Sequence, residues 1–266
     1  MNVSVIIPVY NGFHTIIEAI QSVLRNKICT MEIIVVNDGS TDDTLNAIQR
    51  FKQLNDLEML TVYTIPNGGV SRARNFGIMK AQYDWIAFLD ADDIWEEGKL
   101  ALQISLIQTY IPQSNFIGTA RNNEVLSILG RKILQLHRAS LAELLIKMFP
   151  QTSTALIRRQ SLLNVGLYDE TMTHSEDADL WVRLCYQEGG FYYHPESTVT
   201  TGGGKHNFGA SGLSSNIKKM EEGACTMLKK LYSAGAISLP FYLSLFLYFK
   251  LKYIRRVLIV ALRGRR

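Results

Sequence analysis

The sequence predicts an α/β fold in which a mostly parallel central sheet is flanked by helices. In the first hundred residues, segments typical of strands alternate with segments typical of helices, and the strand segments are almost continuously apolar. Strands with little polar alternation, separated by helices, are typical of parallel sheets covered on both faces. The 266 residues, 47% of them hydrophobic and 20% charged, are enough for one large domain or two small ones with an ample core.

The elements of the first half follow from the spacing of apolar residues. The first apolar run ends at Pro8 and Asn11, and the apolar residues after it recur at helical spacing. The predicted strands are residues 3–9, 32–36, 60–65 and 85–89, and the predicted helices are residues 13–24, 42–54 and 70–81.

The second half is less regular. Residues 100–110 have helical spacing, and residues 152–158 have the composition of a strand. Residues 176–188 form a further predicted helix, and residues 201–214 are expected to form a glycine-rich loop.

Charge and cysteine usage exclude some classes of protein. The net charge is +4, but residues 250–266 carry seven Lys or Arg and no acid, so the rest of the chain has a net charge of −3. A broad nucleic-acid-binding surface is therefore not expected. The three scattered cysteines are typical of reduced thiols in a cytosolic protein. The N-terminus lacks a basic region before its apolar run and is interpreted as a strand rather than a signal peptide.

Polar clusters follow the four predicted strands of the first half. In parallel sheets the carboxyl ends of the strands meet at one edge, where ligands bind. These clusters are therefore expected to converge on a single site. They are Tyr10-Asn11, Asp38-Gly39-Ser40, Asn67-Gly68-Gly69 and Asp90-Ala91-Asp92-Asp93.

The carboxylates after the fourth strand have three interpretations. One of them could cap a helix, although a cap does not account for all three. A phosphatase of the haloacid dehalogenase type also has a D-x-D after an apolar strand, but it expects Thr or Val next, where this chain has Asp93 and Ile94. The favoured hypothesis is that Asp90 and Asp92 hold Mg²⁺ or Mn²⁺ on a nucleotide diphosphate, because these ions prefer carboxylate oxygens. On this view Asp93 does no more than cap the next helix.

Two further positions at this edge each have a structural and a functional interpretation. Asp38 could form an Asx-turn with Ser40 or Thr41 capping the next helix, or it could accept from a nucleoside base or ribose. Arg72 and Arg74 could be solvated surface residues. However, a cation at a helix N-terminus is disfavoured unless an anion such as a diphosphate lies there.

Another pair of acids begins the helix predicted at residues 176–188. Acids in a first helical turn are routine, so Glu176 and Asp177 could simply complement the helix dipole. Asp177, however, shares a face with Trp181 and Leu184, and a carboxylate facing a partly apolar pocket can act as a general base.

Candidate phosphate or metal contacts lie in and before the glycine-rich loop. They are His194, Lys205 and His206, for which a purely structural role is the alternative.

Taken together, these residues resemble the family 2 glycosyltransferases, which have the GT-A fold. Five stretches carry the resemblance, in the family's order, over roughly residues 3–190. They are SVIIPVYN at 4–11, VNDGSTD at 36–42, NGGVSRARN at 67–75, FLDADD at 88–93 and EDADLWVRL at 176–184. Asn37 stands where the family has its first aspartate, but the aspartate usually credited with the nucleoside contact matches Asp38.

The resemblance implies a role for each matching residue. The donor nucleotide sugar, most readily a UDP-hexose, would contact Pro8, Tyr10, Asp38, Asn67, Arg74 and Asp90. Asp92, with Asp90, would bind Mn²⁺ or Mg²⁺. Asp177 would be the base that deprotonates the acceptor hydroxyl in a single inverting displacement, and Glu176 and Trp181 would shape the acceptor pocket.

The sequence is also compatible with two alternatives to this activity. A non-catalytic member of the same fold could act in sugar binding or assembly, although Asp92 and Asp177 are both retained. The D-x-D phosphatase is the more distant alternative.

The chain is expected to divide into a catalytic domain at residues 1–215 and a helical tail at residues 216–266. Within the first, residues 1–110 would bind nucleotide and residues 111–215 would bind acceptor. The tail contains thirteen strongly apolar residues, 237–249, interrupted by Pro240 and shorter than the roughly 20 residues of a membrane-spanning helix.

A basic segment that alternates with apolar residues follows in the tail. This pattern predicts attachment to an anionic membrane from the cytosolic side, with a helix packed on the core as the alternative. By family analogy, the acceptor would be a saccharide, or one linked to polyprenyl diphosphate, in bacterial surface-polysaccharide assembly.

Overall fold

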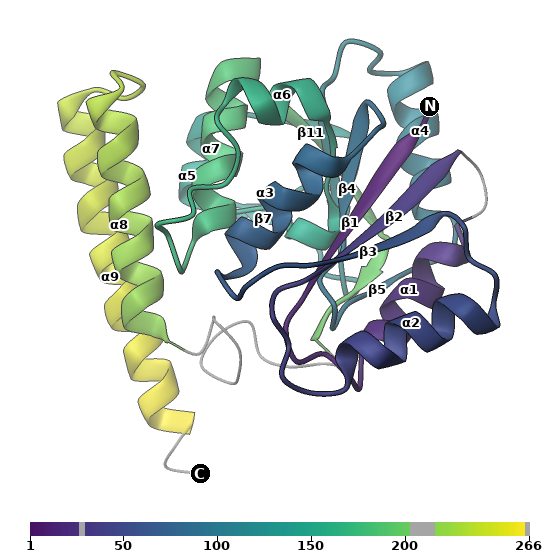
Figure 1. The fold of residues 1–266 in the computed structure, drawn as a ribbon. Helices are drawn as coiled ribbons and strands as arrows, with labels where there is room; N and C mark the ends of the chain where they lie inside the picture. Colours follow the sequence, from purple (N-terminus) through teal and green to yellow (C-terminus); the bar gives the residue numbers. More distant parts are fainter. Residues whose placement is uncertain (27–29, 203–215, 264–266) are drawn as a thin grey trace.

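A central sheet with helices on both faces forms the body of the protein, and a pair of long helices lies along one side (Figure 1). The computed structural model describes residues 1–26, 30–202 and 216–263. The predicted α/β class, with a mostly parallel half, is therefore confirmed.

The sheet has eight strands in the order β3-β2-β1-β4-β10-β6-β11-β9. The first four are parallel to one another, β10 runs antiparallel to both of its neighbours, β11 is parallel to β6, and β9 is antiparallel to β11. In sheet order, the bounds are β3 Leu60–Thr64, β2 Met31–Asn37, β1 Val3–Val9, β4 Trp85–Phe88, β10 Leu156–Arg158, β6 Phe116–Ala120, β11 Phe191–Ser197 and β9 His137–Ala139. Two small ladders pair β5 (Ile94–Trp95) with β12 (Val199–Thr200), and β7 (Ser127–Ile128) with β8 (Arg131–Lys132).

The helices of the first half begin and end within a few residues of their predicted positions. The segment 152–158, predicted as one strand, is instead a 3₁₀ turn followed by β10, because the Gln151 side chain accepts a hydrogen bond from Ser153 N and caps the turn. The helices are α1 Ile16–Leu24, α2 Thr44–Leu54, α3 Val70–Lys80, α4 Lys99–Thr109, α5 Leu141–Ile146, η1 Thr152–Thr154, α6 Arg159–Asn164, α7 Glu176–Glu188, α8 Ile217–Ser233 and α9 Leu239–Arg263.

Both faces of the sheet are buried, which accounts for the continuously apolar strands. Successive residues of a strand point to opposite faces. In β1, Val5 and Ile7 therefore pack in one core with residues of α1 and α4, whereas Ile6 packs in a second core with residues of α3 and α7. All three side chains are fully buried.

Helices α8 and α9 form a hairpin that packs on the second core. Leu228 and Leu231 of α8, and Leu245 and Phe249 of α9, are buried there. The expectation that Pro240 interrupts the apolar segment is wrong. It is the second residue of α9, within the first turn, where the missing N–H has no intrahelical partner to lose. In the described part of the chain, no helix is long and apolar enough to cross a membrane.

Candidate active site

The loops after β1 and β2 are joined by hydrogen bonds at the carboxyl edge of the sheet. Asn11 N donates to Ser40 Oγ (2.9 Å), and Thr41 N donates to Asn11 Oδ1 (2.8 Å). Asn11 has a positive φ of 51°, which Asn tolerates better than most residues. Next to this junction, Pro8 is buried at the end of β1, and Tyr10 is 53% exposed, so its ring is available to a ligand.

Asp38 anchors the loop that leads into α3. Its carboxylate accepts from Gly68 N (2.9 Å) and Gly69 N (2.8 Å), and its carbonyl accepts from Asn67 Nδ2 (2.9 Å). Only 3% of Asp38 is exposed. The structure thus brings together two polar clusters that the sequence places at this edge, and Asp38 fixes the position of the second cluster.

Asp38 does not form the expected Asx-turn, because its carboxylate accepts from Gly68 N and Gly69 N. Ser40 N donates to Asn37 Oδ1 (3.1 Å), so Asn37 makes the side-chain turn. The expectation that Ser40 or Thr41 caps α2 is also wrong, because the helix begins at Thr44 and its N-cap position is Asp43, which makes no side-chain capping hydrogen bond.

Arg74 is the centre of the acidic cluster. Its guanidinium is 4% exposed and donates to Asp90 Oδ1 (2.7 Å) and Glu176 Oε1 (3.2 Å). The guanidinium carbon lies 5.2 Å from the centre of the Tyr168 ring. A cation near a helix N-terminus is disfavoured unless negative charge lies close to it, and these two carboxylates supply that charge to Arg74. Arg72, by contrast, is exposed.

The acids that begin α7 have unusual protonation behaviour. Burial, followed by the neighbouring charge of Asp177, raises the pKa of Glu176 to about 7, although Arg74 acts in the opposite direction. Burial also raises the pKa of the half-buried Asp177, again opposed by Arg74. A carboxylate with a raised pKa is a better proton acceptor, which is the property a general base requires.

Asp90 and Asp92 differ in their surroundings. Asp90 is half-buried and bound to Arg74, whereas Asp92 is exposed, and no hydrogen bond or ion pair from the described residues engages its carboxylate. Among those residues, no group of three or more His, Cys, Asp or Glu could enclose a metal. Magnesium is commonly held by one or two carboxylates together with substrate phosphates, and this pair of oxygen ligands fits that arrangement.

Asp93 does not cap the next helix, which begins at Lys99 after Gly98. It is 4% exposed and accepts from Ser153 Oγ (2.6 Å), Gln151 Nε2 (2.9 Å) and Gly202 N (3.1 Å). Burial, followed by the charge of Asp90, raises the pKa of Asp93 to about 7.

These contacts reveal residues that the sequence interpretation missed. Through these hydrogen bonds Asp93 connects residues 90–93 to η1 and to Gly202, at the start of the glycine-rich segment. Gln151 and Ser153 are its partners from the second half of the chain, and no local pattern marks either of them.

The remaining predicted site residues lie elsewhere or outside the described residues. Trp181 is fully buried and donates from Nε1 to Pro150 O (3.1 Å), so it supports the site from within the core. His194 is half-buried on β11, where its Nδ1 accepts from Glu196 N (3.3 Å). Lys205 and His206 lie outside the described residues.

Comparisons with known proteins connect this geometry to a family. The family model described as "Glycosyl transferase family 2" matches residues 4–166. An uncharacterized glycosyltransferase of Rickettsia bellii is 31% identical over 186 residues, which are 68% of this chain and 26% of that protein. The Escherichia coli protein WfgD, named as a UDP-Glc:alpha-D-GlcNAc-diphosphoundecaprenol beta-1,3-glucosyltransferase, is 32% identical over 185 residues, which are 68% of this chain and 69% of WfgD.

Relatives that match most of this chain can be much longer than it is. The matched region covers only 26–34% of three Rickettsia glycosyltransferases, so this chain spans about a quarter to a third of their length.

Solved structures share the fold at lower sequence identity. S. aureus TarS 1–349 in complex with UDP-GlcNAc has a TM-score of 0.71 and 20% identity, covering 94% of this chain and 71% of that chain. The mannosyltransferase PcManGT from Pyrobaculum calidifontis, in complex with GDP-Man and Mn²⁺, has a TM-score of 0.69 and 16% identity, and the match covers 94% of this chain and 69% of that chain. The family match, the relatives and the shared sheet architecture lead to one conclusion: this chain belongs to the family 2 glycosyltransferases and has a GT-A-like fold.

Proposed function

We propose that this protein is an inverting glycosyltransferase that moves a hexose from a nucleotide sugar, a UDP-sugar by preference, to a hydroxyl of a saccharide or lipid-linked saccharide. The observation that carries the proposal is the half-buried Asp177, a carboxylate of raised pKa beside the Arg74–Asp90–Glu176 cluster. The UDP-sugar named for WfgD and the UDP-GlcNAc bound to TarS support this choice of donor.

The donor would lie along the carboxyl edge of β1, β2 and β4. Tyr10 presents an exposed ring for the nucleoside, and Pro8, two residues earlier, is buried at the end of β1. Asp38 would contact the base or ribose while its carboxylate holds the loop at residues 67–69. The exposed Asn67 would continue this surface, and the buried Arg74 would act on the donor through its ion pair with Asp90, where the sugar would bind.

Asp92, together with Asp90, would hold Mn²⁺ or Mg²⁺. When bound, such an ion stabilises the negative charge that develops on the departing diphosphate. The exposed carboxylate of Asp92, which no described residue engages, supports this assignment, as does the Mn²⁺ in the PcManGT complex.

The reaction would be a single displacement at the anomeric carbon. Asp177 takes the proton of the acceptor hydroxyl while the acceptor oxygen bonds to that carbon. The bond from the carbon to the diphosphate oxygen breaks, and the nucleoside diphosphate leaves with the electron pair. General-base catalysis is typically worth about 10²–10⁴ in rate, or roughly 3–5 kcal/mol of barrier.

A transfer assay tests this function. Release of nucleoside diphosphate from UDP-, GDP- and dTDP-sugars is measured with lipid-linked saccharide acceptors, with and without Mn²⁺. Asp177→Asn should bind donor as tightly as the wild type but lose transfer. A loss of donor binding would remove Asp177 from the base role. Absence of release from every donor, with a competent acceptor, would favour a non-catalytic sugar-binding member. Hydrolysis of phosphate monoesters would favour the D-x-D phosphatase.

The same proposal places the enzyme in the cytoplasm, peripherally on the inner face of the plasma membrane, where a polyprenyl-diphosphate-linked acceptor in surface-polysaccharide synthesis is accessible. The support is helix α9, which combines lysines and arginines with an apolar surface that nothing in the described chain covers. Its exposed large apolar residues are Leu239, Leu243, Phe246, Leu247, Tyr248, Leu251, Ile254, Val257, Leu258 and Leu262.

Attachment is tested on this exposed surface, because deleting α9 would also remove the buried Leu245 and Phe249 and uncover the core residues that they pack against, such as Leu228 and Leu231. Replacing Leu251, Ile254 and Leu258 together by Ser should abolish cosedimentation with anionic vesicles and leave the thermal midpoint unchanged. Unchanged cosedimentation would contradict membrane attachment through α9. Neutral vesicles serve as the control for the electrostatic part of binding.

A further inference from the structure

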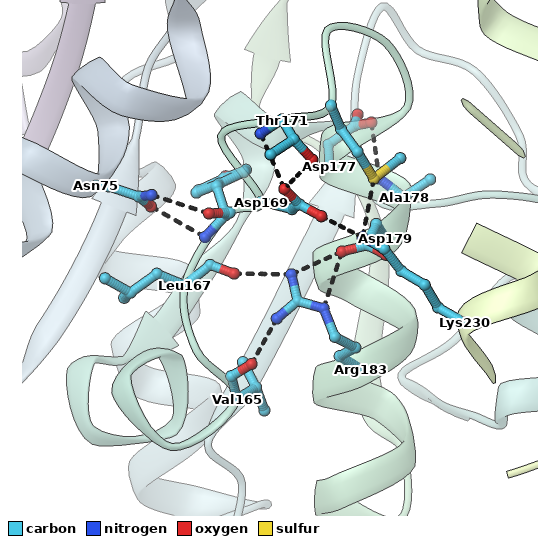
Figure 2. Close-up of polar contacts among 12 residues, drawn as sticks. Asn75, Val165, Leu167, Asp169, Thr171, Asp177, Ala178, Asp179, Arg183 and Lys230 are labelled. Atoms are coloured by element: carbon cyan, nitrogen blue, oxygen red, sulfur yellow. Dashed lines mark hydrogen bonds and ion pairs between the residues drawn. The ribbon is translucent and has the colours of Figure 1, made fainter. Parts of the chain in front are cut away.

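A lysine of the C-terminal hairpin reaches the beginning of α7. Lys230 Nζ on α8 donates to Asp179 Oδ1 (3.0 Å) and to Asp169 Oδ2 (2.5 Å) (Figure 2). Asp179 belongs to the first turn of α7, two residues after Asp177, and is 1% exposed. One ammonium group thus binds two segments, the start of α7 and the loop before it.

The buried Asp179 also orders that loop through a second cation. Its Oδ2 accepts from Arg183 one turn later, at 2.8–2.9 Å. The same guanidinium donates to Val165 O (2.6 Å) and Leu167 O (2.7 Å). These bonds are drawn in Figure 2, where Arg183 lies between the helix and the loop.

The far side of the loop is fixed to α3. Asn75, the residue after Arg74, accepts from Tyr168 N (2.9 Å) through Oδ1 and donates to Tyr168 O (2.9 Å) through Nδ2. The Tyr168 ring in turn lies against the Arg74 guanidinium, with its centre 5.2 Å from the guanidinium carbon. Segment 165–172 therefore contacts both the arginine of the site and the helix that carries its acids.

We propose that Lys230 is a positioning residue for catalysis, which holds the first turn of α7, and with it Glu176 and Asp177, in register with Arg74. This inference rests on the proposed function of Asp177. The C-terminal hairpin then has a role in transfer that is independent of any membrane.

The position of Asp177 matters because catalytic groups must meet the reacting atoms within a fraction of an ångström. A displacement of about 1 Å can cost roughly 100-fold in rate. Without Lys230, Asp179 keeps its bond to Arg183 and the helix keeps its apolar contacts, so the fold persists. What is lost is the link between Asp169 and Asp179, and the start of α7 can then shift relative to the loop.

Kinetics of Lys230→Met test the proposal, with Lys229→Met as the matched control, because Lys229 is the exposed neighbour on the same helix. Lys230→Met should lower kcat by about tenfold or more, while the donor KM stays within about twofold of the wild type. Lys230→Arg should restore most of the rate, because it returns a cation to both carboxylates. A purely stabilising ion pair would lower the thermal midpoint without this separation of kcat from KM. Equal kcat values for Lys230→Met and Lys229→Met would overturn the proposal.

Amide hydrogen exchange tests the positioning role of Lys230 independently of the proposed transferase activity, because the measurement needs no turnover. Lys230→Met should accelerate exchange in residues 165–179 and leave β1 and β2 unchanged. If exchange there matches that of Lys229→Met, Lys230 does not position α7, whatever the enzyme transfers. If the wild type releases no nucleoside diphosphate while exchange accelerates as expected, the proposed function fails and the link through Lys230 stands. Asp169→Asn removes one carboxylate charge from the same link and should produce a smaller change of the same kind, which keeps the test decisive if Lys230→Met does not fold.

Discussion

Replacing Arg74 by Met removes the only cation that contacts both Asp90 and Glu176 in the described part of the chain. The Glu176 contact is nearly dry, with the two side chains 4% and 9% exposed, and a hydrogen bond of this charged kind is worth roughly 1.5–3 kcal/mol. The Asp90 contact is 28% exposed at the carboxylate, so solvent screens it and it adds about 1 kcal/mol or less. The contact with the Tyr168 ring adds about 1 kcal/mol. We therefore expect Arg74→Met to lower the free energy of unfolding by about 3–5 kcal/mol, as for other broken buried ion pairs.

A loss of this size lowers the thermal midpoint by roughly 10 °C in a protein of this length, measured by far-UV circular dichroism at pH 7.5. The decrease should be smaller at pH 5.5, because the pKa of Glu176 is already about 7 with Arg74 present and rises further without it. The carboxyl is then neutral and no longer an unpaired buried charge. Arg72→Met, two residues away on the same helix and exposed, should change the midpoint by no more than about 2 °C. A decrease for Arg74→Met under about 3 °C, or an equal decrease at both pH values, would refute this account.

Three further predictions concern pH and packing. Because Glu176 has a folded-state pKa of about 7 against an ordinary value of 4.5, the folded state binds more protons in that window. Stability should therefore fall as pH rises from 4.5 to 7. Glu176→Gln should flatten the plot of thermal midpoint against pH. The same slope in both proteins would count against the raised pKa of Glu176. Transfer should instead rise with pH as Asp177, whose pKa is raised by burial, loses its proton and becomes able to act as a base. A rate that falls as pH rises from the acid side would contradict that role. Gly118→Ala places a Cβ 2.3 Å from the Pro150 ring, so it should destabilise the protein by about 1–3 kcal/mol in thermal unfolding, and an unchanged midpoint would show that the backbone relaxes there.

The first half of the fold was predictable because local patterns and tertiary structure agree there. Val3–Val9 is a strand with the predicted bounds, since an apolar run ending in polar turn residues has few other solutions beside helical segments. Helix Glu176–Glu188 was also predicted with its observed bounds. The segment 152–158 was not, because the bond from Ser153 N to Gln151 forms a 3₁₀ turn that composition does not reveal.

The C-terminal tail also shows what its sequence could and could not predict. Its apolar and basic composition predicted an amphipathic segment, and the exposed face of α9 agrees with that composition. The composition did not show that Pro240 lies in the first turn of one continuous helix, or that Leu245 and Phe249 face inward. Which side of a helix is buried depends on its neighbour, here α8.

The sequence by itself determined the α/β class, and it predicted which acids follow the strands at one edge of the sheet, because strand periodicity and turn chemistry are local properties. Only the tertiary structure decided how those acids are paired. Arg74 contacts both Asp90 and, 102 positions along the sequence, Glu176; Asp93 is held by Ser153, and Lys230 reaches Asp179 from another helix. Such contacts depend on how distant elements pack, and packing also sets the burial that raises the pKa of Glu176.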